Sequence, residues 1–235
     1  MSDRYFVEKP IAADCVTLVG PEAHHLIHVM RADPGAQVTL FDGSGAEFPA
    51  IVERVGRSDV ALTVLSREPI DRELPFEITL GVALPKGERQ KWLVEKAVEL
   101  GVARIVPLRT QRGVAQPVEQ TLARLRRTVV EASKQCRRNR LLEIADPRSW
   151  PDFITETPPA PRRLLAHPAV KAAVKGDAAL FLPGPVVLAV GPEGGFTDDE
   201  VVSAVAAGWQ TVNLGPRILR VETASLLLVA RVVSG

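Results

Sequence analysis

Two units of strand, glycine loop and helix follow one another between Val186 and Ala230, and this order constrains the fold more than any other feature. Val186–Val190 is wholly apolar and ends at a glycine, which predicts a short strand buried on both faces of a sheet. The loop Gly191–Gly195 follows, and Thr197 with Glu200 three residues later predicts a capping box that starts a helix. Loops that follow the strands of an α/β sheet are where such sheets bind ligands, so we expect a binding site here.

The second unit repeats this order. Thr211–Leu214 predicts a strand, Gly215 and Pro216 end it, and Ile218–Thr223 leads into a last helix. Glycine has no Cβ, so the backbone of both loops can approach a ligand closely. The loops lack the G-x-G-x-x-G fingerprint and the G-x-x-x-x-G-K-[ST] phosphate loop, which disfavours a nucleotide-dependent oxidoreductase. We expect the two loops to lie side by side and form the floor of a pocket.

Length and charge limit the classes of protein that fit. The 235 residues allow two small domains, and the net charge of +1, from 29 basic and 28 acidic residues, means that any basic surface must be local. Cys15 and Cys136 form no C-x-x-C pair, which indicates a reducing compartment. The charged N-terminus is unlike a signal peptide and no apolar run reaches transmembrane length, so we expect a cytoplasmic protein without a membrane partner.

Residues 1–68 predict a small, mostly β domain. Its strand-like runs are Gln37–Phe41, Glu47–Val55 and Val60–Ser66. Short strands separated by tight turns are typical of a small barrel. A short helix is expected over Glu22–Met30.

That helix carries His24, His25 and His28, which invite a metal interpretation. A further ligand at suitable spacing is missing, so we expect no metal site and a helix-surface or RNA-facing role instead.

Residues 75–235 predict an α/β domain, after a linker at Arg67–Pro75. Strand patterns at Ile78–Leu84 and Arg104–Leu108 alternate with a helical pattern at Glu88–Leu100. Such alternation implies a parallel sheet covered by helices on both faces.

Thr121–Cys136 predicts an amphipathic helix. Its apolar residues, three and four positions apart, are Leu122, Leu125, Val129, Ala132 and Cys136. The opposite face is basic, and Thr121–Arg140 holds seven basic residues and one acidic residue. This concentration can neutralise several phosphates of a nucleic acid, although a solvated helix face is the alternative.

The two loop motifs, GPEGGFTDDE and LGPRILRVETA, together resemble the signature of the knotted SPOUT methyltransferases, and within them the ribosomal RNA small subunit methyltransferase E family. Two further segments, KGERQKWLVEKAVELGVARIVPL and HHLIHVMRADPGAQVTLFDGSG, resemble the opening of that family's catalytic domain and its N-terminal barrel. The resemblance implies an α/β fold with a C-terminal, trefoil-knotted parallel sheet flanked by helices over residues 75–235. It also implies a PUA-like β-barrel that binds RNA over residues 1–68.

The resemblance implies methyl transfer from S-adenosyl-L-methionine to N3 of a uracil in 16S rRNA of the small ribosomal subunit. The residues that it places at the cofactor are Ala166, His167, Gly191, Glu193, Gly194, Gly195, Leu214, Gly215, Ile218 and Leu219. Negative charge must develop on the uracil as N3 reacts, and a guanidinium would stabilise this charge. Arg220 is our first choice for that role, with a salt bridge to Glu222 or Glu193 as its alternative. Either carboxylate is a candidate catalytic base for the N3 proton, and the residues leave this choice open.

The expected partner is the 16S rRNA, and the family's Gln-x-x-Arg pattern is matched by Gln135 and Arg138. The candidate RNA-binding residues are Arg31, Arg124, Arg127, Lys134, Gln135, Arg137 and Arg138. The last helix, from about Glu222 to Val233, is apolar on nearly every side, which predicts a homodimer through the C-terminal domain. The alternative functions are a knotted methyltransferase acting on a ribose 2′-OH or a guanine N1, and a non-catalytic RNA-binding assembly factor.

Overall fold

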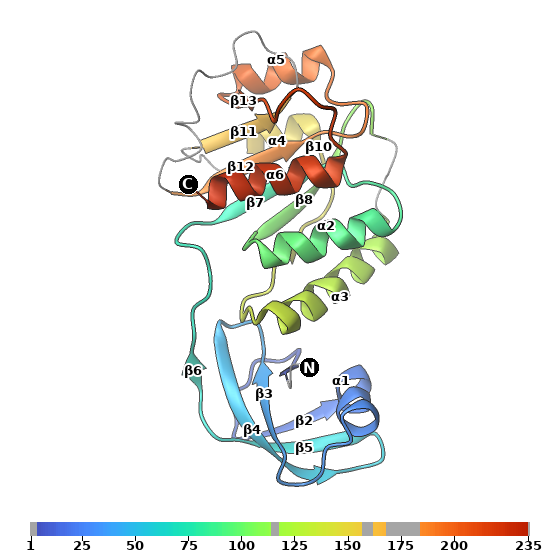
Figure 1. The fold of residues 1–235 in the computed structure, drawn as a ribbon, viewed down its shortest axis with the longest axis vertical. Helices are drawn as coiled ribbons and strands as arrows, with labels where there is room; N and C mark the ends of the chain where they lie inside the picture. Colours follow the sequence, from blue (N-terminus) through green and yellow to red (C-terminus); the bar gives the residue numbers. More distant parts are fainter. Residues whose placement is uncertain (1–3, 114–117, 157–161, 168–183, 235) are drawn as a thin grey trace. The chain divides into compact units, whose positions relative to one another are not determined.

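The chain folds into two compact units, seen in a computed structural model that describes residues 4–113, 118–156, 162–167 and 184–234 (Figure 1). The first unit takes the chain up to Glu73 together with Ser133–Leu141. The second unit takes Leu74–Ala132 and the chain from Leu142 onward.

The first unit is a curled, largely antiparallel sheet. Its strands are β1 (Arg4–Phe6), β2 (Cys15–Val19), β3 (Gln37–Phe41), β4 (Ala46–Val55), β5 (Asp59–Val64) and β6 (Glu68–Pro69). They pair in the order β1-β3-β4-β5-β2, with β6 beside β4. Burial alternates along β4, as expected for a strand with one face on a core, and Tyr5, Leu40, Phe48 and Leu62 fill that core.

Two features of this unit depart from the sequence patterns. The helix expected over residues 22–30 is an α-helix, α1 (Gly20–His24), that continues as a π-helix, η1 (His25–Val29). The segment Arg67–Pro75, expected to be a linker, contributes β6, whose Pro69 pairs with Ala46.

The second unit is built on a parallel sheet, which confirms the predicted α/β class. Its strands are β7 (Ile78–Val82), β8 (Arg104–Arg109), β9 (Glu143–Ile144), β10 (Arg148–Ser149), β11 (Arg162–Ala166), β12 (Val186–Val190) and β13 (Gln210–Val212). They pair in the order β10-β8-β7-β12-β11-β13, with β9 beside β8, and every pair is parallel. The trefoil knot stays a prediction.

Helices cover both faces of this sheet, as Figure 1 shows. The helices that follow β7 in the chain are α2 (Glu88–Glu99), α3 (Glu119–Cys136), α4 (Trp150–Glu156), α5 (Asp198–Ala206) and α6 (Val221–Val233). Helix α6 packs against α2, β7 and β12, whereas α4 packs against α5 and β8. All five residues of β12 are buried, which confirms the prediction from its apolar run.

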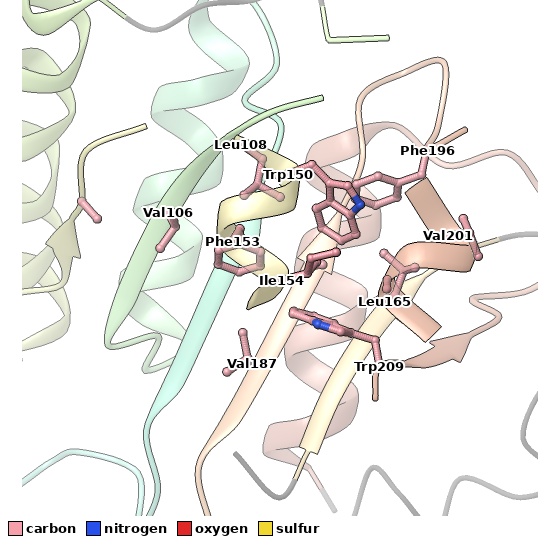
Figure 2. Close-up of a cluster of buried hydrophobic side chains, with 13 residues drawn as sticks. Val106, Leu108, Trp150, Phe153, Ile154, Leu165, Val187, Phe196, Val201 and Trp209 are labelled. Atoms are coloured by element: carbon pink, nitrogen blue, oxygen red, sulfur yellow. The ribbon is translucent and has the colours of Figure 1, made fainter. Parts of the chain in front are cut away.

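Aromatic side chains fill the core under α4 and α5 (Figure 2). The rings of Trp150 and Phe196 lie 4.3 Å apart, and Phe153 and Trp209 lie 5.6 Å apart. Trp150 also donates a hydrogen bond of 3.0 Å from Nε1 to the carbonyl of Glu200 in α5. This core therefore fixes the start of α5, which follows the first glycine loop.

Helix α3 begins two residues earlier than its pattern predicted and ends at the expected residue. Leu122, Leu125, Val129 and Ala132 of the predicted apolar stripe are buried, whereas Cys136 at its end is half-buried. Within the described ranges, no helix is both long enough and apolar enough to cross a membrane.

Candidate functional site

Three neighbouring strands end at one edge of the second unit's sheet. Because β11, β12 and β13 are parallel and in register, their last residues Ala166, Val190 and Val212 lie at the same edge. The loops that follow these strands enclose a cavity of about 260 Å³. The structure brings all ten predicted cofactor residues to its walls: Ala166, His167, Gly191, Glu193, Gly194, Gly195, Leu214, Gly215, Ile218 and Leu219.

The first glycine loop packs closely on the aromatic core. A Cβ on Gly191 would lie 2.9 Å from the Phe196 ring, closer than atoms can pack, so only glycine fits at this position. The amide of Gly195 donates a hydrogen bond of 2.8 Å to the carbonyl of Pro192, which closes a tight turn. Close packing and this hydrogen bond therefore define the shape of this wall of the cavity.

Glu200 fixes the end of this loop through hydrogen bonds to backbone amides. The carboxylate is buried, and its two oxygens accept hydrogen bonds from the amides of Thr197 at 2.8 Å and Gln111 at 2.9 Å. The Thr197 hydroxyl accepts in return from the amide of Glu200, which confirms the predicted capping box. One carboxylate thus ties the start of α5 to the segment after β8.

Arg112 holds the same loop from the solvent side. Its guanidinium donates hydrogen bonds to the carbonyls of Gly194 at 2.9 Å and Phe196 at 3.4 Å. Arg112 lies 82 residues before Gly194 in the chain, and it is itself exposed to solvent. The C-terminal part of the loop that lines the cavity is therefore held by two side chains, Arg112 and Glu200.

The second loop has fewer supports. Gly215 has a φ of 112°, which favours glycine, and its amide donates a hydrogen bond of 2.8 Å to the side chain of Asn213. Ile218 lines the cavity and is 95% exposed. An apolar side chain in this position gains contacts when a ligand fills the cavity.

Arg220 lies at the rim, between the lining residues Leu219 and Val221, at the N-cap of α6. Its side chain is exposed and makes no hydrogen bond or ion pair with any other residue that the structure describes. The alternative expectation, a salt bridge from Arg220 to Glu222 or Glu193, is not what these residues form.

Arg89, rather than Arg220, forms ion pairs with the carboxylates of Glu193 and Glu222. From the start of α2 its guanidinium approaches Glu193 at 3.4 Å and Glu222 at 3.9 Å. Glu193 lines the cavity and is half-exposed, whereas Glu222 is buried. The two predicted catalytic carboxylates therefore lie within the span of one guanidinium.

Sequence reasoning missed Arg89 and Arg112 because neither lies in the two glycine-loop motifs. Arg89 follows β7, the strand beside β12. Because β7 and β12 are parallel, the carboxyl end of β7 lies at the same edge of the sheet as the cavity. That topology, rather than any motif, would have identified it. Other lining residues that were not predicted are Val190, Pro192, Phe196, Arg217, Val221 and Ala224.

The predicted RNA-binding residues fall into two groups. Those with exposed side chains are Arg31, Arg124, Arg127, Gln135 and Arg137. In contrast, Lys134 donates to Glu22 at 3.0 Å, and Arg138 is buried and pairs with Glu73 through two nitrogens. Lys134 and Arg138 are thus already bound to carboxylates of the first unit.

The three histidines form no metal centre with their surroundings. His24 and His28 stack with ring centroids 4.7 Å apart, and His25 lies 5.9 Å from Tyr5. Nowhere in the described residues do three His, Cys, Asp or Glu side chains meet in an arrangement that could hold a metal ion.

Comparison with protein families gives two matches on this chain. An RNA methyltransferase domain matches residues 72–233, and an RNA methyltransferase PUA domain matches residues 18–65. The first match therefore spans the parallel sheet and the cavity, and the second spans most of the curled sheet.

Individual proteins are similar over most of the chain. Ribosomal RNA small subunit methyltransferase E of Synechocystis is 35% identical over 92% of this chain and 72% of its own length. The protein of the same name from Bacillus subtilis is 28% identical over 97% of this chain and 95% of its own length.

Solved structures are similar as well. Ribosomal RNA small subunit methyltransferase E from Neisseria gonorrhoeae, bound to S-adenosyl methionine, is 30% identical with a TM-score of 0.88, covering 98% of this chain and 96% of that one. A protein of Legionella pneumophila, solved with the cofactor SAM, is 32% identical with a TM-score of 0.90, covering 99% of this chain and 97% of that one.

Proposed function

The chain belongs to the ribosomal RNA small subunit methyltransferase E family of RNA methyltransferases, and from this premise we propose that it methylates N3 of one uridine in 16S rRNA. The methyl donor is S-adenosyl-L-methionine, and the acceptor lies in the small ribosomal subunit. The observation that carries the proposal is the cavity between the two glycine loops, because it brings together the ten predicted cofactor residues from three strand ends.

The cavity fits this cofactor. Its 260 Å³ is just below the roughly 300–1,000 Å³ that small-ligand sites span. Backbone groups of Gly191, Gly194 and Gly195 can approach the ligand without side chains in the way, and Ile218 and Leu219 offer apolar surface to the adenine. When bound, the cofactor supplies a methyl group on a positively charged sulfur.

The protein's contribution to methyl transfer is position and charge. The clamped first loop fixes one wall, which keeps the reacting atoms in line. Arg220 at the rim is a guanidinium without a partner among the described residues, so it is available to the developing negative charge on the uracil. Glu222 and Glu193 are the candidates for the base.

We assign RNA contacts to the exposed basic side chains. Arg124 and Arg127 lie on the solvent face of α3, while Arg31, Gln135 and Arg137 are exposed on the first unit, the proposed RNA-binding domain. Lys134 and Arg138 contribute to RNA binding by holding the chain around them rather than by reaching phosphates, since carboxylates already occupy them.

We also propose that the protein forms a homodimer through its C-terminal domain and that it acts in the cytoplasm. Helix α6 keeps Leu226, Leu227, Ala230 and Val233 only half-buried, and Trp92 on the neighbouring α2 is 45% exposed. Apolar surface of this kind is what a second subunit covers. Sedimentation at micromolar concentration should give a dimer, and a stable monomer would contradict this part.

The test is transfer of a labelled methyl group. The protein, labelled S-adenosylmethionine and small-subunit particles lacking the modification should give label at N3 of one uridine when the rRNA is digested and mapped. Label on a ribose 2′-OH or a guanine N1 would replace the acceptor, and no label with no cofactor binding in calorimetry would favour an assembly factor.

A further inference from the structure

Glu222 carries a buried oxygen that no described group satisfies. The residue is 5% exposed at the start of α6, and its Oε2 accepts no hydrogen bond. A buried polar atom without a partner is rare and energetically unfavourable. Such an oxygen next to a ligand cavity is suited to accept a proton donor that comes with the ligand.

Arg89 neutralises this carboxylate without satisfying it. Its Nη1 lies 3.9 Å from Oε2, within ion-pair range and beyond hydrogen-bond range. The Arg89 side chain is 38% exposed, so its remaining N–H groups can reach a ligand. Side by side, the carboxylate and the guanidinium present an acceptor and a donor.

Glu193 differs from Glu222 in its surroundings. It lies 3.4 Å from the same guanidinium, but its side chain is 51% exposed and therefore hydrated. Water already satisfies a hydrated carboxylate, which has less to gain from a donor on the substrate. The two candidates for the base are thereby distinguished by burial.

Resting on the methyl transfer proposed above, we propose that Glu222 and Arg89 form the subsite for the acceptor base. The edge of uracil at N3 has an N–H between two carbonyls. Glu222 Oε2 accepts the N3–H, and Arg89 donates to an adjacent carbonyl oxygen. Arg220, two residues before Glu222, provides a second donor for the other carbonyl. Guanine, whose N1–H has an amino group on one side, fits two guanidinium groups less well.

The proton balance of the step is then complete. The N3 proton moves to Glu222, the N3 electron pair forms the new bond to the methyl carbon, and the carbon–sulfur bond breaks with its electron pair left on sulfur. Arg89 stabilises the charge that develops on the carbonyl oxygen, and the proton passes from Glu222 to solvent after the product leaves.

Glu222→Gln, Arg89→Ala and Arg89→Lys test this assignment, with Arg104→Ala as the matched control. Arg104 also forms an exposed ion pair of 3.4 Å, with Glu143, but it is the first residue of β8 and so lies at the end of the strand opposite the cavity. Single-turnover transfer should fall by roughly 100-fold or more in Glu222→Gln and Arg89→Ala. Arg89→Lys should be intermediate because it keeps the charge and loses the planar fork. Cofactor affinity by calorimetry and the unfolding temperature should match those of the control.

Particles reconstituted with 5-fluorouridine rRNA separate chemistry from structure. Fluorine makes the N3–H more acidic, so loss of the base or of the guanidinium should slow transfer less, and each penalty should shrink by at least about threefold. Penalties that are equal for both acceptors, losses of cofactor affinity that match the losses of rate, or wild-type rates in the variants would overturn the assignment. If the wild-type protein itself transfers no methyl group, the proposed function fails and the subsite with it.

Discussion

Two groups of arginines, one from each unit, lie in opposite surroundings. In the first unit, Arg4 and Arg138 are buried, and both are paired with carboxylates that are themselves largely buried. In the second unit, Arg112 and Arg220 lie exposed beside the cavity, and Arg89 is only partly covered. A buried, paired guanidinium cannot be removed without stranding a charge, whereas an exposed one at a cavity can bind a ligand. The surroundings, rather than the residue type, therefore separate structural arginines from functional ones.

The largest expected effect comes from Arg138→Ala. Removing this guanidinium leaves the partly buried carboxylate of Glu73 without its ion pair, which should destabilise the first unit by about 3–5 kcal/mol. Denaturant unfolding measures the loss, and exposed Arg57→Ala in the same unit is the control. An unchanged denaturation midpoint in Arg138→Ala would contradict the structural role of this buried arginine.

Glu47 gives the next largest effect, and its effect depends on pH. Burial alone would raise the pKa of Glu47, but hydrogen bonds and charge from Arg72 and Arg4 outweigh it and leave the pKa below the usual 4.5. Glu47→Gln should therefore cost about 1–3 kcal/mol at neutral pH.

The sign of the pH effect follows from the lowered pKa. The ionised carboxylate stabilises the folded state fully above pH 4.5, and this contribution is lost as pH falls through the lower folded value. The stability difference between wild type and Glu47→Gln should narrow as pH drops below 4.5. A difference that stays constant down to acid unfolding would contradict the role of the ion pairs.

Arg112→Ala should act on the cavity instead of on stability. Losing the two hydrogen bonds to the first loop frees that wall, and the affinity for S-adenosylmethionine should fall about tenfold, or about 1.4 kcal/mol. The unfolding temperature should stay near that of Arg104→Ala. A large loss of stability with unchanged affinity would place Arg112 with the structural arginines.

Arg127→Ala should give the smallest effect. Arg127 is exposed on α3 and has no ion pair within the described residues, so its loss should weaken RNA-particle binding only a few-fold. The slope of log affinity against log salt should become shallower by about 1. A slope equal to that of the wild type would remove Arg127 from the RNA contacts.

Local patterns account for the parts of the fold that the sequence predicted well. The run Val186–Val190 and the capping box of Thr197 and Glu200 depend on neighbours in the chain, and both are found as expected. The buried stripe of α3 follows from helical spacing in the same way. The parallel sheet follows from the alternation of strands and helices.

Long-range contacts account for what the sequence did not predict. Lys134 meets Glu22 across 112 residues, Arg138 meets Glu73 across 65, and β6 forms because Pro69 lies opposite Ala46. No local pattern reports such pairs, so basic residues on one helix face looked equally available to RNA. The contacts of Arg89 with Glu193 and Glu222 also join residues far apart in the chain, so no local pattern predicted them.

The most direct measurement is a crystal structure of this chain with S-adenosylhomocysteine. We predict that the ligand lies between the loops at residues 191–196 and 214–219, with Ile218 covered by it and Arg112 still bonded to the first loop. A ligand bound outside these loops, or loops that face bulk solvent in the complex, would contradict the account.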